Sequence, residues 1–232
     1  MLGTVNVLRS VAAAGTGVVR RVVLTSSVAA VHGEMAAPPK AGPLYTCDDW
    51  NETSTVEGGQ AYHLSKARAE REAWRVAAGA GLDLVTVCPN FVLGPALSRA
   101  ACGTSVGYAK GMIEGGTISG APTICDVRDV ARAHVLAAIT PAASGRYIVS
   151  QPGGALPGEV AAALAAGLPA GAALGPVEAP ADPADAAKAR IDGSRVATEL
   201  GLVLRPVRET VADMACSLVA LGLATPKMGA AE

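Results

Sequence analysis

A tyrosine and a lysine lie four residues apart in the segment Ala-Tyr-His-Leu-Ser-Lys, which ends at Lys66. Residues 60–78 contain no Gly or Pro and are rich in Ala, Arg and Glu, so they predict a helix with Tyr62 and Lys66 on one face. A free phenol has a pKa of about 10, but a neighbouring ammonium favours the phenolate. Such a phenol can donate a proton to the alkoxide that forms during carbonyl reduction. The spacing alone is equally compatible with a solvated surface pair.

A serine upstream favours the catalytic interpretation of this pair. The apolar run from Arg21 to Thr25 is typical of a buried strand, and Ser27 follows it, 35 residues before Tyr62. Sites in parallel sheets collect at the carboxyl ends of the strands. We therefore expect the Ser27 hydroxyl to reach the same carbonyl oxygen as the phenol.

The order of the expected elements is typical of an α/β fold with a parallel sheet. Helices are expected at 3–14, 61–78, 105–114, 127–139, 192–200 and 206–223, and strands at 21–25, 81–89 and 146–150. Residues 32–59 and 90–95, which contain Gly and Pro, are expected to be loops. We expect residues 1–150 to belong to the sheet domain and residues 151–232 to form a smaller lobe, to which the loop at 89–122 contributes.

Three further polar residues are given structural roles by their positions. Asp126 and Asp129 resemble a variant capping box at the start of the helix at 127–139, so we expect caps rather than catalytic acids. His134 lies inside the same helix and is expected to pack or to hydrogen-bond there.

Composition narrows the function classes. Twenty acidic and nineteen basic residues give a net charge of −1 without a basic run, which argues against a nucleic-acid partner or an anionic membrane surface. Five scattered cysteines predict a reduced, cytoplasmic protein without a metal site. The Ala-rich stretch at 159–175 is shorter than the roughly 20 residues of a membrane span. A small-molecule substrate is the default expectation, and the oligomeric state stays open.

Five motifs together resemble the extended short-chain dehydrogenase/reductases, and within them the dihydroflavonol reductase and cinnamoyl-CoA reductase group. The motifs are Thr-Ser-Ser27, Tyr62-x-x-x-Lys66, Cys-Pro89-Asn-Phe-Val-Leu-Gly-Pro, Asp126-Val-Arg-Asp-Val-Ala and Ser-Gly-Arg-Tyr147. The resemblance implies a Rossmann-type sheet with a small carboxyl-terminal substrate lobe and NADP(H) as the hydride carrier. It also implies reduction of an aldehyde, a ketone or an acyl-CoA thioester of phenylpropanoid or flavonoid type.

The resemblance assigns roles to three catalytic residues. Ser27 would polarise the carbonyl and Tyr62 would donate the proton. Lys66 would favour the phenolate and bind the nicotinamide ribose.

Cofactor contacts are implied for Tyr62 and Lys66 and for three further residues. Pro89 and Val92 would line the nicotinamide pocket, and Ser105 would contact a cofactor phosphate. Ordinary loop packing is the alternative for all three.

Two departures from the group leave the substrate open. Cinnamoyl-CoA reductases read Tyr-Cys-Tyr-Gly-Lys after Asn-Trp, whereas this chain reads Tyr62-His-Leu-Ser-Lys66 after Gln-Ala. Dihydroflavonol reductases carry a substrate-binding Asn five residues after the catalytic serine, and His32 holds that place here.

A third departure concerns the dinucleotide-binding motif. Family members begin with a strand followed by Gly-x-x-Gly-x-x-Gly, a motif that this sequence lacks. Relative to the family, three βα units of about 30 residues each are missing, so we expect an amino-terminally truncated Rossmann domain with exposed apolar surface and weak NADPH affinity. A non-catalytic reductase remnant and an NAD-dependent epimerase or dehydratase are the alternative functions.

Overall fold

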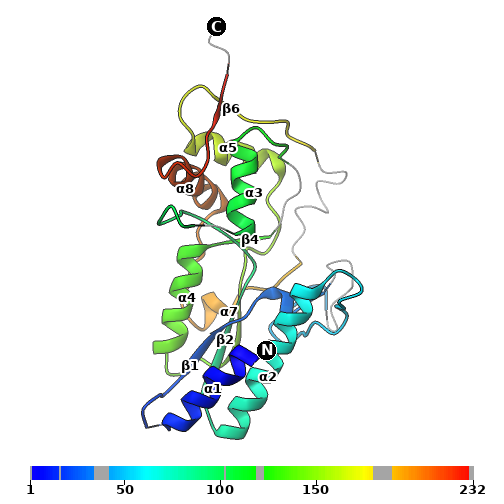
Figure 1. The fold of residues 1–232 in the computed structure, drawn as a ribbon, viewed down its shortest axis with the longest axis vertical. Helices are drawn as coiled ribbons and strands as arrows, with labels where there is room; N and C mark the ends of the chain where they lie inside the picture. Colours follow the sequence, from blue (N-terminus) through cyan, green and yellow to red (C-terminus); the bar gives the residue numbers. More distant parts are fainter. Residues whose placement is uncertain are drawn as a thin grey trace. The chain divides into compact units, whose positions relative to one another are not determined.

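The computed structural model describes residues 2–15, 17–33, 42–101, 103–118, 123–179 and 190–229 (Figure 1). These residues form two compact units. Unit 1 takes its residues from 1–90, 130–150 and 190–203, and unit 2 from 91–129, 151–189 and 204–232. The boundary predicted at residue 150 coincides with one of the points where the chain changes unit, and residues 190–203 return to unit 1.

Unit 1 is built on a three-stranded parallel sheet in the order β1-β2-β5. The strands are β1 (Val22–Thr25), β2 (Leu84–Pro89) and β5 (Gly145–Val149). All six residues of the central strand β2 are buried, as expected for a parallel strand rich in β-branched residues. The predicted α/β class with a parallel sheet is therefore confirmed.

Helices α1 (Leu2–Ala14) and α2 (Ala61–Ala80) pack against each other in unit 1, and Figure 1 shows them side by side. Leu8 of α1 lies against Ala73 and Ala77 of α2, whose small side chains allow close approach. Gly81 ends α2 in the left-handed conformation, with a φ of 65° that glycine adopts without strain.

The strand β1 is also fixed to α4 (Val127–Ile139). The Arg21 guanidinium donates to the carbonyl oxygens of Ala137 (2.9 Å) and Thr140 (2.7 Å), which satisfies acceptors at the end of that helix. At the other end of β1, the Thr25 hydroxyl lies 2.7 Å from Nε2 of His134. The predicted hydrogen-bonding role of His134 is therefore confirmed. Two short helices complete unit 1, η1 (Val28–Ala30) and α7 (Arg195–Thr198).

In the described residues of unit 2, an apolar core is surrounded by the helices α3 (Thr104–Ile113), α5 (Pro157–Gly167) and α8 (Val207–Ala220). Strands β3 (Phe91–Leu93) and β4 (Ile124–Asp126) pair in parallel, and β6 (Ala172–Ala173) pairs antiparallel with β7 (Lys227–Met228). The prediction of a loop at 90–95 is wrong for residues 91–93, which form β3. These apolar residues pair with β4, more than 30 positions further along the chain.

Close contact between α5 and α8 depends on a glycine in unit 2. A Cβ at Gly167 would lie 2.1 Å from the carbonyl oxygen of Ala212 in α8, so the two backbones could not approach as they do. Leu164 and Leu218 are buried in the same core. Sequence patterning missed α5, because its Ala-rich residues show no clear apolar stripe. None of the helices within the described ranges is long and apolar enough to cross a membrane.

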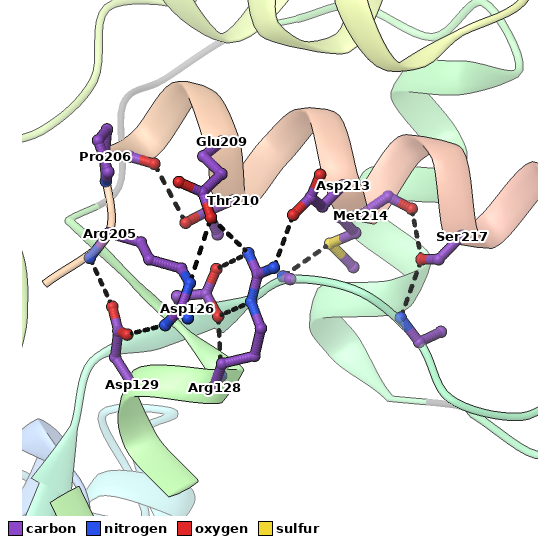
Figure 2. Close-up of polar contacts among 12 residues, drawn as sticks. Asp126, Arg128, Asp129, Arg205, Pro206, Glu209, Thr210, Asp213, Met214 and Ser217 are labelled. Carbon is purple, nitrogen blue, oxygen red and sulfur yellow. Dashed lines mark hydrogen bonds and ion pairs between the residues drawn. The ribbon is translucent and has the colours of Figure 1, made fainter. Parts of the chain in front are cut away.

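An ion-pair network joins the start of α4 to α8 within unit 2, and Figure 2 shows its residues. Oδ1 of Asp126 accepts the backbone N–H of Arg128 at 2.7 Å, so Asp126 caps α4 as predicted. Asp129 instead accepts the backbone N–H of Arg205 at 2.6 Å and pairs with its guanidinium, so the cap predicted there is wrong. Arg128 bridges Asp126 (2.7 Å) and Asp213 (2.6 Å).

Asp126 is expected to contribute more to the free energy of unfolding than Asp213, the more exposed carboxylate that pairs with Arg128. Burial alone would raise the pKa of the Asp126 carboxyl, but the hydrogen bonds of Arg128 outweigh burial and lower it. We expect Asp126→Asn to lower the free energy of unfolding, measured with urea at pH 7, by about 1–3 kcal/mol, because a buried partner of Arg128 loses its charge. The difference from wild type should shrink as pH falls below about 4, where the unfolded carboxyl protonates and then the folded one.

The matched control for this substitution is Asp213→Asn. The Asp213 side chain is 43% exposed and pairs with the same arginine. Its loss should cost about 0–1 kcal/mol, and equal costs for the two variants would contradict the role given to Asp126.

Candidate active site

The first turns of α2 carry the predicted phenol and ammonium. Tyr62 is 59% exposed, and Nζ of Lys66 lies 5.8 Å from the centroid of its ring. Both residues therefore lie on one face of the helix, as predicted. Within the described part of the chain, Lys66 makes no ion pair, so its ammonium is available to a ligand.

Ser27 lies between β1 and η1. Its backbone is extended, and its Oγ accepts the N–H of Ala29 at 3.2 Å, which makes it the N-cap of η1. The hydroxyl oxygen is thus used as an acceptor, and its proton can be donated to a ligand oxygen. The helix η1 packs against α2, so the serine turn and the Tyr62 helix are neighbours within unit 1.

A buried carboxylate on α2, one turn after Lys66, determines how the helix sits on the sheet. Glu70 is 1% exposed. Its Oε2 accepts the hydroxyl of Ser26 at 2.5 Å, and its Oε1 accepts the hydroxyl of Thr86 at 2.8 Å. Nε of Arg146 donates to Oε1 at 2.8 Å. We name these four residues, Ser26, Glu70, Thr86 and Arg146, the Glu70 network.

The electrostatics of the Glu70 network favour its charged form. Burial alone would raise the pKa of the Glu70 carboxyl, but the hydrogen bond and charge of Arg146 and the two hydroxyl donors lower it overall. The same ion pair raises the pKa of Arg146 against the effect of burial. Every buried side-chain polar atom in the described residues has a hydrogen-bond partner, so the network leaves no orphaned group.

Arg146 extends this network to the loop before α2. Its Nη1 donates to the carbonyl oxygens of Cys47 (2.7 Å) and Asp49 (2.5 Å), and its guanidinium lies 3.9 Å from the centroid of the Trp50 ring. The side chain of Asn51 donates to the carbonyl oxygen of Ala29 in η1 at 2.8 Å. The described part of the loop predicted at 32–59 is therefore held against the serine turn. Residues 34–41 lie outside the described residues.

His32 packs beside this turn. Its ring centroid lies 5.0 Å from that of Tyr45, and only 7% of the residue is exposed. Burial is the largest cause of its lowered pKa, and the nearby His63 adds to the effect. A neutral imidazole against Tyr45 thus stands at the position where dihydroflavonol reductases carry an Asn.

The three cofactor residues predicted beyond α2 fall in different units. Pro89 ends β2 in unit 1, is buried, and pairs with Val149 of β5. Val92 on β3 and Ser105 in the first turn of α3 are half-buried residues of unit 2. Their contacts with a cofactor stay predictions.

Two of the buried thiols, Cys47 and Cys88, lie close to the Glu70 network. Burial, with the nearby Glu70 carboxylate, raises the pKa of the Cys88 thiol to about 12, and burial raises that of Cys47. Neither thiol forms a nucleophilic thiolate at neutral pH. Among the same residues, no three His, Cys, Asp or Glu side chains are grouped to hold a metal ion.

Sequence reasoning missed the Glu70 network. Residues Ala67, Glu70, Ala73 and Ala77 recur at helical spacing, and all four are buried. A charged residue within an otherwise apolar stripe was the signal that pointed to a buried partner.

Over about two thirds of its length, the chain is similar in sequence to curated reductases. No family model matches it. It is 39% identical over 154 residues to tetraketide alpha-pyrone reductase 1 of Arabidopsis thaliana, covering 64% of this chain and 45% of that protein. Cinnamoyl-CoA reductase 1 of Petunia hybrida is 35% identical, covering 65% of this chain and 45% of the relative. Anthocyanidin reductase of Vitis vinifera is 34% identical, covering 63% and 46%. The chain thus spans fewer than half of the residues of these relatives.

Solved structures extend the likeness to most of the chain. Gre2 of Candida albicans in complex with NADPH superposes with a TM-score of 0.78 and 25% identity, covering 94% of this chain and 69% of that structure. Vestitone reductase from alfalfa gives a TM-score of 0.66 and 21% identity, covering 88% and 66%, which supports the fold alone.

Proposed function

Because this chain is homologous to the dihydroflavonol reductase and cinnamoyl-CoA reductase group of short-chain dehydrogenase/reductases, we propose that it carries the catalytic residues of an NADP-dependent carbonyl reductase. The observation that carries the proposal is the placement of Ser27 beside the helix that bears Tyr62 and Lys66. The proposed substrate is an aldehyde, a ketone or an acyl-CoA thioester of phenylpropanoid or flavonoid type.

The residues of unit 1 fit the nicotinamide end of the cofactor. Lys66 offers an ammonium without an ion-pair partner among the described residues, and Tyr62 beside it is exposed. Donors of this kind suit the hydroxyl groups of a ribose. Bound NADPH would supply the hydride for the reaction. In unit 2, Ser105 lies in the first turn of α3, where free backbone N–H groups suit a phosphate.

The protein groups handle the charge that forms on the carbonyl oxygen. The Ser27 hydroxyl, already held by its bond from Ala29, donates a hydrogen bond to that oxygen. The Tyr62 hydroxyl donates its proton to the same oxygen, so an aldehyde or a ketone becomes an alcohol. A thioester becomes a hemithioacetal in the same step, and the C–S bond then breaks to release the thiol and leave an aldehyde. Lys66 stabilises the phenolate that remains.

Relatives support the substrate class. The names of two of them specify a cinnamoyl-CoA and an anthocyanidin, which are a thioester and a flavonoid. The shared chemistry is reduction beside a planar conjugated system.

Two measurements on the 232-residue chain test the proposal. Titration with NADPH, followed by the fluorescence of the cofactor, tests binding. NADPH consumption with cinnamoyl-CoA, a dihydroflavonol and cinnamaldehyde tests turnover and substrate class. Both are repeated with the amino-terminal Rossmann half of a relative added. Lack of binding and lack of turnover in both settings would contradict the proposal.

Lys66→Met is expected to weaken both NADPH binding and turnover. The substitution removes the ammonium that binds the ribose and stabilises the phenolate, so kcat should fall by about 10²-fold or more and the Kd for NADPH should rise. Steady-state kinetics and fluorescence titration measure the two effects. Lys110→Met is the control, because Lys110 is exposed on α3 and pairs with Glu114. Unchanged NADPH affinity in Lys66→Met would contradict the double role.

A further inference from the structure

A single carboxylate connects the two parts of the candidate active site. Glu70 lies one helical turn after Lys66 and two turns after Tyr62, on the same helix. Its Oε2 accepts the hydroxyl of Ser26, the residue immediately before Ser27, at 2.5 Å. One hydrogen bond thus joins the helix with the proton donor to the turn with the carbonyl-polarising hydroxyl.

The other contacts of Glu70 hold it in place without touching that turn. Thr86 on the central strand donates to Oε1 at 2.8 Å, and Arg146 on β5 donates to the same oxygen at 2.8 Å. The side chain of Arg146 is 7% exposed and that of Glu70 is 1% exposed, so neither has access to bulk water. Nη2 of Arg146 also donates to Oε2 at 3.2 Å, and Nε1 of Trp74 on α2 donates to Oε1 at 3.3 Å. The carboxylate is therefore fixed by β2, β5 and its own helix, and its Oε2 accepts from both Ser26 and Arg146.

The backbone beyond Ser26 packs against α2 through η1, but its polar contacts are made mostly elsewhere. The N–H of Ser26 donates to the carbonyl oxygen of Val87 at 2.7 Å, which continues the pairing with β2. The Ser27 hydroxyl is engaged by Ala29 within its own turn. Among the described residues, the hydrogen bond from Ser26 to Glu70 is the one that joins this turn directly to α2.

We propose that Glu70 acts through Ser26 as a positioning residue, which holds the Ser27 hydroxyl at its working place relative to Tyr62. This inference rests on the proposed reductase function. In this proposal Glu70 and Ser26 contact neither substrate nor cofactor, since only 1% and 5% of these residues are exposed. Their effect comes from geometry, since a displacement of about 1 Å between reacting groups can cost on the order of 100-fold in rate.

The test compares two single-hydroxyl deletions on the same carboxylate in the 232-residue chain. Ser26→Ala removes the donor beside Ser27, and Thr86→Val removes a donor of similar burial on β2. Two readouts are measured. One is steady-state kinetics with NADPH, and the other is hydrogen exchange of the amides at 29–32, which form the hydrogen bonds of η1 and its cap. Ser26→Thr, which restores a hydroxyl, serves as the rescue.

Support for the proposal is a specific pattern. Ser26→Ala lowers kcat by roughly 10- to 100-fold with an unchanged KM for NADPH, and it speeds exchange at 29–32. Ser26→Thr recovers both quantities, and Thr86→Val changes neither. Equal effects of Ser26→Ala and Thr86→Val, or no effect of either, overturn the proposal, because the carboxylate then acts only on stability. If the wild-type chain shows no turnover either alone or with the added amino-terminal half, the reductase function fails, and the exchange comparison alone decides the positioning role by the same criteria.

Discussion

Replacing Tyr62 by Phe is expected to lower kcat for carbonyl reduction by about 10²- to 10⁴-fold, which is the usual contribution of a general acid. The substitution removes one hydroxyl from an exposed position on the first turn of α2. Neighbouring Lys66 keeps its ammonium, so the Kd for NADPH should stay within about twofold of wild type. Fluorescence titration and steady-state turnover of the same preparation separate the two quantities.

Tyr147→Phe provides the matched control for this prediction. Tyr147 lies on β5, an outer strand of the sheet in unit 1, and its hydroxyl donates to Glu199 at 2.8 Å. Its loss should lower thermal stability slightly and leave kcat unchanged. If Tyr62→Phe keeps more than about half of the wild-type rate, Tyr62 is not the proton donor.

The largest expected effect on stability follows from Glu70→Gln. The substitution keeps the shape of the side chain but leaves the charge of Arg146 buried without a counter-ion. Breaking a buried pair in this way costs about 3–5 kcal/mol, so the urea midpoint should fall strongly or the variant should fail to fold. Glu72→Gln is the control, because Glu72 lies on the same helix in an exposed pair with Arg75 and should change little.

The pH dependence of this effect has a defined sign. Because the pKa of Glu70 is lowered in the folded state, its contribution is complete above the pKa of the unfolded carboxyl, about 4.3, and is lost as pH falls through the folded value. Wild type and Glu70→Gln should therefore differ most at neutral pH and converge below about pH 4. A constant difference from pH 7 to pH 3 would show that the carboxylate charge is not the source of the stability.

Local sequence patterns determined most of the elements in this protein. The Tyr62–Lys66 spacing places both side chains on one helix face because an α-helix repeats every 3.6 residues, and α2 spans Ala61–Ala80. The β-branched runs that predicted strands form β1 and β2, and Ser27 follows β1. These features depend on residues that are neighbours in the chain, so periodicity and propensity suffice to predict them.

The tertiary structure decided which polar residues are buried and what they bind. Glu70 and Arg146 are 76 residues apart, and neither shows by its own neighbours that it will pair with the other. Asp129 resembled a cap but binds Arg205, also 76 residues away. The free energy of a buried charge depends on the partner that folding brings to it. Helical periodicity alone therefore placed Tyr62 and Lys66 on one face. The role of Glu70, which joins their helix to the serine turn, was determined only when the helix packed on the sheet.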